Sequence, residues 1–209
     1  GHQAGTDAVR RTVEAAERLG IGTLTLFAFS GDNWRRPSRE VASLMHLFEE
    51  YFRRDLPRWE KSGTRLSVIG RRDRFSPQLQ EAIEDAEAES ADGQGLHLRI
   101  ALDYSGRDSI LQAARQLRRR IIEPTREAFA ELLGEITNSG GPSPEVDLLI
   151  RTGGELRLSD FMLWESAYAE LIFSEQLWPD FSGTDLVAAL CEYRTRDRRF
   201  GRVEELVAS

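Results

Sequence analysis

Arginines, glycines and a serine gather after one apolar stretch of this 209-residue chain, in a pattern that suits the binding of an anion. The stretch runs from Leu148 to Ile150, and the residues after it include Arg151, Thr152, Gly153, Gly154, Arg157 and Ser159. The guanidinium fork of arginine matches the geometry of phosphate oxygens, and glycines let a backbone approach them closely. Because ligands of open α/β sheets bind beyond the carboxyl ends of strands, the segment predicts a phosphate site, with a plain strand-to-loop exit as the alternative.

Polar clusters follow two more predicted strands. After strand 23–28 come two aromatic residues and several polar ones, namely Phe29, Ser30, Asn33, Trp34 and Arg36. After strand 96–102 comes a second cluster, Asp103 to Arg107. Any one of these clusters alone favours ordinary loop chemistry over function. The carboxyl ends of parallel strands lie at one edge of a sheet, however, so we expect all three clusters to converge on one pocket.

The residue types in this pocket argue against several reaction classes. The three histidines, His2, His46 and His97, are scattered, which disfavours a Ser/His/Asp triad. The sequence contains no Gly-x-x-x-x-Gly-Lys phosphate loop, no Gly-x-Gly-x-x-Gly fingerprint and no Cys/His metal spacing. Glu165 and Glu170 follow the third cluster, and either can hold Mg²⁺ against a diphosphate unless it is an ordinary surface carboxylate.

Helical and strand-like patterns alternate along the chain, which is typical of a mostly parallel central sheet flanked by helices on both faces. We therefore predict the α/β class, with a single domain over residues 1–209. Strands are expected at 23–28, 65–69, 96–102, 148–150 and 170–173. The longest expected helix covers 38–59, and a short one is expected at 161–167.

Composition narrows the partners and the compartment. The net charge of -7 argues against nucleic-acid binding, which normally needs a basic surface. A single cysteine, Cys191, excludes an internal disulfide and favours a reducing cytoplasm. Its place in an apolar helical stripe predicts burial in the core. No apolar run approaches the ~18 residues that span a bilayer.

The expected helix 38–59 carries a dense apolar stripe that includes Leu44, Leu47 and Phe48. Such stripes usually pack into the core of a protein. The alternative is the wall of an apolar channel, because an anionic head site beside a hydrophobic tunnel would suit a lipid diphosphate.

Taken together, these residues resemble the cis-prenyltransferase family, to which the bacterial undecaprenyl diphosphate synthases belong. The resemblance rests on Gly1 to Gly5, Leu24 to Pro37, Ile150 to Phe161 and Arg198 to Gly201. It implies a transferase that joins isopentenyl diphosphate to an allylic prenyl diphosphate and forms a new Z double bond. It also implies dependence on Mg²⁺, a homodimer, and a hydrophobic tunnel within each subunit. The chemistry of such a product is compatible with transient membrane contact at release, although no motif indicates it.

The resemblance also implies roles for individual residues. Arg151, Arg157 and Ser159 would hold the isopentenyl diphosphate head, and Arg36 would contact diphosphate in the same pocket. Ser30 and Asn33 would position the condensing carbons and assist proton removal. His2 would lie near the allylic diphosphate, Glu170 would bind Mg²⁺, and Phe29 and Trp34 would line the junction with the tunnel. The residues that would line the tunnel itself are Leu44, Leu47 and Phe48.

Three departures from the family pattern leave alternatives open. The family's N-terminal strand and its Asp-Gly-Asn-Gly-Arg-Trp loop are absent from this sequence, and we expect that this segment was lost from it. A non-catalytic accessory subunit of a heteromeric prenyltransferase is the alternative. Asp103 replaces the more usual asparagine, which is the one sequence feature that supports a specialised short-chain or irregular synthase. Arg202 stands where a second glycine is common.

Overall fold

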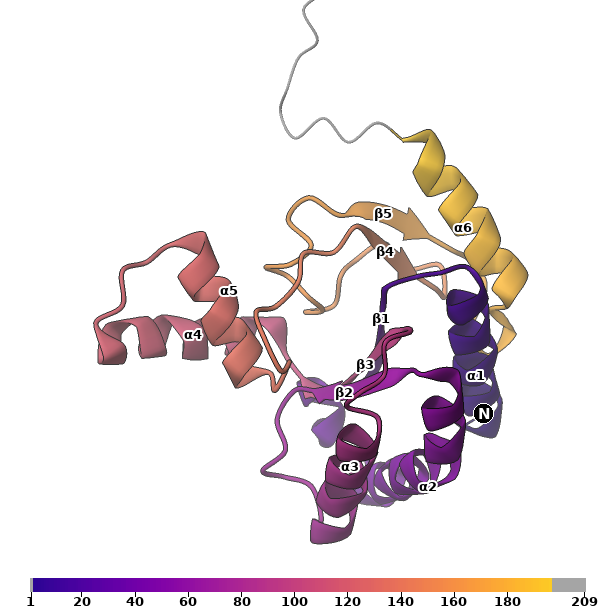
Figure 1. The fold of residues 1–209 in the computed structure, drawn as a ribbon, viewed down its shortest axis with the longest axis horizontal. Coiled ribbons are helices and arrows are strands. Elements are labelled where there is room, and N and C mark those ends of the chain that lie inside the picture. Colours follow the sequence, from indigo (N-terminus) through magenta and orange to yellow (C-terminus); the bar gives the residue numbers. More distant parts are fainter. Residues whose placement is uncertain (1, 197–209) are drawn as a thin grey trace, which may run out of the picture.

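Apolar strands and amphipathic helices alternate in the computed structural model as the sequence predicts (Figure 1). The structure describes residues 2–196, without the side chains of His2 and Gln3. The helices are α1 (His2–Arg18), α2 (Ser38–Ser62), α3 (Pro77–Glu89), α4 (Gly106–Arg120), α5 (Arg126–Ile136) and α6 (Gly183–Thr195), with 3-10 turns η1 (Gly31–Arg35) and η2 (Trp178–Asp180). The strands are β1 (Thr23–Ser30), β2 (Arg65–Ile69), β3 (His97–Tyr104), β4 (Leu148–Arg151) and β5 (Glu170–Phe173).

Every strand pairing among the described residues is parallel, as expected. The strands form two sheets, a three-stranded one in the order β1-β3-β2 and a two-stranded one of β4 and β5. Within the described part of the chain, β1 and β4 each keep one edge without a strand partner. The three polar clusters that the sequence singled out lie at the carboxyl ends of β1, β3 and β4.

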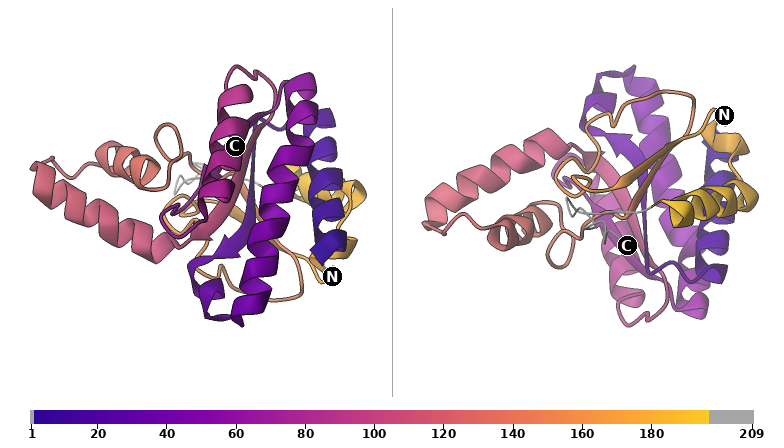
Figure 2. Two further views of the ribbon diagram at one scale, coloured as in Figure 1. Left: turned by 90° about the horizontal axis from the view of Figure 1, so that it is seen from below. Right: turned by 90° about the horizontal axis from the view of Figure 1, so that it is seen from above.

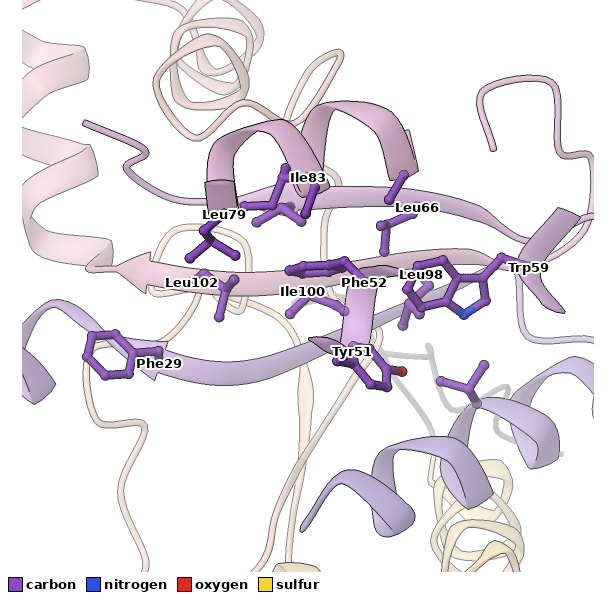
Figure 3. Packing of buried hydrophobic residues seen from close by; sticks show 14 of the residues in the cluster. Phe29, Tyr51, Phe52, Trp59, Leu66, Leu79, Ile83, Leu98, Ile100 and Leu102 are labelled. Carbon is purple, nitrogen blue, oxygen red and sulfur yellow. The ribbon is translucent and has the colours of Figure 1, made fainter. Parts of the chain in front are cut away.

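The main core lies between the three-stranded sheet and α2 and α3 (Figure 3). Leu98, Ile100 and Leu102 of β3 face this core, together with Phe52 and Trp59 of α2. Fully burying an aliphatic side chain of this size contributes about 1.5–3 kcal/mol, so this cluster is the largest apolar contribution that holds the sheet to its helices.

A bulge in β1 changes which face its aromatic residues occupy. The register with β3 shifts between Phe27 and Phe29, so Ala28 has no partner in the ladder. Phe29 joins the main core, whereas Phe27 stacks on Phe161 at the opposite face, with ring centroids 4.5 Å apart. Residues two apart in a regular strand share a face, so the bulge separates the two rings.

Helices α4 and α5 pack against each other and project from the rest of the molecule in every view (Figures 1 and 2). Leu132 and Leu133 of α5 pack with Ala113 of α4 in a small separate cluster. No helix in the described residues is long and apolar enough to cross a membrane.

Two expectations about local structure are wrong. Residues 161–167 form turns rather than a helix, because Asp160 and Met162 adopt positive φ values of 66° and 44°, which interrupt a right-handed helix. Cys191 is exposed on α6 rather than buried, since that helix buries Leu186 and Ala189 instead.

Candidate active site

The arginines after β4 gather around one carboxylate. Arg151 donates from Nη1 to Ser159 Oγ at 2.8 Å, and its Nη2 pairs with Glu155. Arg157 pairs with the same carboxylate. Hydrogen bonds from Arg151 and Arg157 lower the pKa of Glu155, which keeps that carboxylate charged. The three residues expected to bind one diphosphate head therefore do lie together, and Glu155 offsets one of the two positive charges.

The two glycines of this loop shape the backbone rather than offer free donors. Gly153 and Gly154 have φ values of 91° and 74°, a region that glycine enters without strain. Their N–H groups donate to the carbonyls of Gln176 and Ser174, at 2.7 and 2.9 Å. Both N–H groups therefore already have partners, and close approach of a phosphate to this backbone stays a prediction.

Asp160 joins the third cluster to the second. Its carboxylate accepts from Ser105 Oγ at 2.5 Å and from the backbone N–H of Arg107 at 2.8 Å, at the beginning of α4. Its carbonyl accepts from Gly106 N at 2.9 Å. A carboxylate at this position satisfies N–H groups that a helix leaves free at its first turn. The loop after β4 is thus fixed to the end of β3.

The first cluster lies beside the second because β1 and β3 are neighbours. Ser30 is aligned with Tyr104 in the ladder. A side chain built on Gly31 would lie 3.7 Å from Ser105 Cβ and 3.8 Å from Asp103 Oδ1. The first cluster therefore lies beside the second, and Asp160 joins the third cluster to the second. A single pocket shared by all three clusters stays a prediction.

Within the first cluster, Asn33 holds the turn η1 against β1. Its Oδ1 accepts from the backbone N–H of Ser30 at 3.0 Å. Trp34 packs edge-to-face on the buried ring of Phe29, with centroids 5.4 Å apart. These four residues lie together as predicted. Arg36 is exposed and pairs with Glu40 at 3.0 Å, so its expected contact with diphosphate stays a prediction.

Glu170 lies away from the arginine cluster. Glu170 is the first residue of β5 and pairs with Leu148, whereas Arg151 pairs with Phe173, three residues further along. At ~3.3 Å per residue, about 10 Å along the strands separates Glu170 from Arg151. The Glu170 carboxylate accepts from Arg196 at 2.8 Å. No group of three or more histidine, cysteine or acidic side chains gathers in residues 2–196. Without diphosphate oxygens the described side chains do not complete a Mg²⁺ site, and the role of Glu170 as a Mg²⁺ ligand stays a prediction.

The residues expected to line a tunnel divide into two groups. Leu44 and Phe48 pack with the main core between α2 and the sheet. Leu47 is half-buried and is not among the residues of that cluster. Packed side chains fill this region, so the tunnel stays a prediction. His2 and the segment Arg198 to Arg202 also stay predictions, since the side chain of His2 and that segment lie outside what the structure describes.

Two residues near the site escaped the sequence analysis, Glu155 and Arg74. Glu155 stands four residues after Arg151 and two before Arg157, a spacing that indicates ion pairs with these arginines. Arg74 carried no signal, because it pairs with Asp103 across 29 positions of sequence. That pair gives Asp103 a partner in the fold, and the specialised short-chain or irregular synthase stays an alternative.

Comparisons with known proteins agree with this geometry. The family model described as "Putative undecaprenyl diphosphate synthase" matches residues 1–201. The chain is 53% identical over 207 residues to isoprenyl transferase 1 of Bradyrhizobium diazoefficiens, covering 99% of this chain and 82% of that protein. It is 46% identical over 211 residues to the ditrans,polycis-undecaprenyl-diphosphate synthase ((2E,6E)-farnesyl-diphosphate specific) of Pseudomonas aeruginosa, covering 99% of this chain and 83% of that protein.

Two solved structures share the fold. A probable undecaprenyl diphosphate synthase from Campylobacter jejuni has a TM-score of 0.85 at 31% identity, covering 97% of this chain and 94% of that one. Lavandulyl diphosphate synthase from Lavandula x intermedia, in complex with dimethylallyl diphosphate, has a TM-score of 0.86 at 36% identity, covering 96% and 88%. The two scores do not separate one activity from the other.

Proposed function

Since the chain belongs to the undecaprenyl diphosphate synthase family of cis-prenyltransferases, we propose that it condenses isopentenyl diphosphate with an allylic prenyl diphosphate to give a Z-configured polyprenyl diphosphate. The observation that supports the proposal is the grouping of Arg151, Arg157 and Ser159 in one loop, which Asp160 joins to the end of β3, the neighbour of β1.

In the proposed reaction, Arg151, Arg157 and Ser159 bind the diphosphate of isopentenyl diphosphate. The diphosphate replaces Glu155 as the partner of both arginines, because a phosphate presents more charge and more acceptor oxygens than one carboxylate. Because the ion pairs with Glu155 already gather the two guanidinium groups, less ordering is needed when the diphosphate takes the place of the carboxylate.

Ser30 and Asn33 act next to the condensing carbons in this proposal. The allylic carbon–oxygen bond breaks and the leaving diphosphate keeps the electron pair. The isopentenyl double bond then forms the new carbon–carbon bond, and loss of one proton creates the Z double bond. Asn33 already holds the turn that presents both side chains, and Phe29 and Trp34 supply the apolar surface that suits a carbocation.

Mg²⁺ belongs to the proposal as a general requirement of the family, and it would neutralise charge on the leaving diphosphate. In this structure Glu170 pairs with Arg196 and lies at the opposite end of the β4–β5 pair from Arg151. The same observation gives some support to the alternative, an accessory subunit that needs a catalytic partner.

We further propose that a strand carrying the family's aspartate loop fits between β1 and β4. Both strands have an unpaired edge in the described part of the chain, and Phe27 of β1 is 36% exposed there. A parallel strand could pair with both edges and join the two sheets into one.

An assay of two chains tests these proposals, the 209-residue chain and a chain extended by that strand and loop. Each is incubated with labelled isopentenyl diphosphate, Mg²⁺ or EDTA, and dimethylallyl, geranyl or farnesyl diphosphate. We expect Z-polyprenyl products from the extended chain with Mg²⁺ and none with EDTA. If a well-folded extended chain forms no product with any allylic substrate, the result would contradict the enzyme proposal and favour the accessory subunit.

The apolar groups near β5 support a homodimer. Trp164 and Tyr168 are exposed by 38% and 53%, and Trp164 packs on Phe129 of the projecting helix α5. Exposed aromatic side chains grouped in this way are typical of protein–protein contacts. We propose that a second copy covers this surface, which is defined by Phe129, Trp164 and Tyr168.

A further inference from the structure

Arg74 connects the end of β3 to the turn that carries Asn33 and Trp34. It lies in the loop between β2 and α3, far in sequence from both of its partners. Its Nε donates to Asp103 Oδ2 at 2.7 Å, and its Nη2 pairs with Asp103 Oδ1. Its guanidinium carbon lies 4.9 Å from the centre of the Trp34 ring. One side chain therefore touches two of the three clusters.

Asp103 is built to hold Arg74 in place. Its side chain is completely buried, and its φ of 51° lies in a region that residues other than glycine seldom adopt. A buried carboxylate is costly unless it has a cationic partner with good geometry. The bidentate pair supplies this partner and fixes the plane of the guanidinium, which a single hydrogen bond would leave free to rotate.

The loop itself is fixed against β3. A side chain on Gly70, whose φ is 122°, would lie 2.0 Å from the carbonyl oxygen of Leu102, so only glycine lets the loop approach this closely. Arg71 N donates to the carbonyl of Asp103 at 3.2 Å. The backbone that carries Arg74 is thus anchored on the same strand end as its carboxylate.

Trp34 has few other polar restraints. Its Nε1 is buried and has no hydrogen-bond partner within the described residues. One side of the ring meets Phe29, and the guanidinium of Arg74 lies near its face. A cation–π contact with a held guanidinium favours one orientation of the indole.

We propose that Arg74, oriented by Asp103, is a positioning residue that sets Trp34 and the turn η1 for the condensation. This inference rests on the proposed function of Ser30, Asn33 and Trp34. Arg74 acts through the indole rather than on the diphosphate.

Arg74→Lys tests the proposal, because lysine keeps the positive charge but loses the planar fork. The protein is labelled with 5-fluorotryptophan, and the ¹⁹F resonance of Trp34 is identified with Trp34→Phe. Arg71→Lys is the matched control, since Arg71 pairs with exposed Asp73 in the same loop and its side chain has no contact with η1 in the described structure. Steady-state kcat and KM for isopentenyl diphosphate are measured on the same samples, in the extended chain if the 209-residue chain is inactive.

We expect Arg74→Lys to shift the Trp34 resonance and to lower kcat on the order of tenfold, with KM for isopentenyl diphosphate within about twofold. Arg71→Lys should change neither. The proposal is overturned by an unchanged Trp34 resonance, by a shifted resonance with unchanged kcat, or by a large rise in KM at unchanged kcat, which would place Arg74 on the diphosphate. Wild-type protein that makes no Z-prenyl product would overturn the proposed function first, and this inference with it.

Discussion

At the scale of single residues, the site is an arrangement of charges that compensate one another before any substrate arrives. Arg151 is the best-held cation of the arginine cluster, with Ser159 and Glu155 as partners and only 22% of its side chain exposed. Arg157 has 61% of its side chain exposed and contacts only the carboxylate among the described residues. Arg151 should therefore contribute more to binding than Arg157.

Arg151→Lys should raise KM for isopentenyl diphosphate about tenfold or more, because a charge-assisted hydrogen bond contributes about 1.5–3 kcal/mol and lysine cannot reproduce the fork. Arg157→Lys should raise it less, and Arg71→Lys should leave it unchanged. Initial rates against isopentenyl diphosphate concentration measure these effects. Equal KM values for wild type and Arg151→Lys would contradict the proposed diphosphate site.

A substitution of Glu170 distinguishes a structural role of this carboxylate from a metal-binding role. If its carboxylate mainly holds Arg196, Glu170→Gln should lower the melting temperature by a few degrees, as expected for a loss of about 1 kcal/mol, and leave the Mg²⁺ concentration at half-maximal rate unchanged. Calorimetry and a Mg²⁺ titration of the rate give the two values. A shift of the half-maximal Mg²⁺ concentration by tenfold or so would instead support the metal role that the family resemblance implies.

His97 gives the fold a dependence on pH. Burial, helped by the charges of Arg65 and Arg99, lowers its pKa to about 4 from an ordinary value of 6.5. Between these values the unfolded chain binds more protons than the folded one, so the free energy of unfolding should fall as the pH drops from about 6.5 towards 4. Urea titrations at pH 7 and pH 5 measure this loss.

The pH effect assigned to His97 should shrink in His97→Gln, which keeps a polar group near Ser67 without a titrating ring. His46→Gln is the control, since His46 is exposed on α2 and lies outside this contact. The same loss of stability between pH 7 and pH 5 in His97→Gln as in the wild type would exclude His97 as the cause.

At the scale of elements, β3 is the centre to which the other parts attach. Its residues face the main core on one side, and on the other side Arg99 is 1% exposed beneath the segment that precedes β4. Arg99 donates to Ser139 Oγ at 2.8 Å, while its Nε and Nη1 have no partner in the described structure. Burial lowers the pKa of Arg99, and the charge of buried Glu165 opposes that shift.

Glu165→Gln should destabilise the fold by about 1–3 kcal/mol, because it removes the negative charge that opposes the burial of Arg99 and weakens the hydrogen bond from Ser143 Oγ at 2.6 Å. Urea unfolding measures the change, and Glu175→Gln, at an exposed glutamate, is the matched control. Adding Arg99→Met should recover part of the loss. Equal losses from Glu165→Gln with Arg99 present or replaced would show that the two residues do not interact.

At the scale of the whole molecule, the exposed aromatic surface and the projecting hairpin of α4 and α5 favour a pair of chains. Light scattering on the eluted protein should give about twice 23.7 kDa at micromolar concentration. Trp164→Glu should shift the protein towards the monomer, whereas Leu177→Glu, at a residue 60% exposed beside η2, should not. A monomeric wild type at these concentrations would reject the proposed dimer.

The sequence by itself determined the fold class, the order of the strands along the chain and most of the residues proposed for the site. The spacing of apolar residues and the local composition indicate strands and helices. The carboxyl ends of parallel strands share one edge of a sheet. Those two facts were enough to expect that Ser30, Asp103 and Arg151 lie near one another.

Only the tertiary structure decided which groups within the site are already paired. The bulge at Ala28 sends Phe27 and Phe29 to opposite faces, the glycine donors of the third cluster bind the chain after β5, and Arg74 reaches Asp103 and Trp34. Each depends on contacts between segments far apart in sequence, which leave no periodic pattern in either segment. Positive φ at Asp160 and Met162 likewise turned an amphipathic stretch into turns, because tertiary hydrogen bonds outweighed a weak local preference for helix.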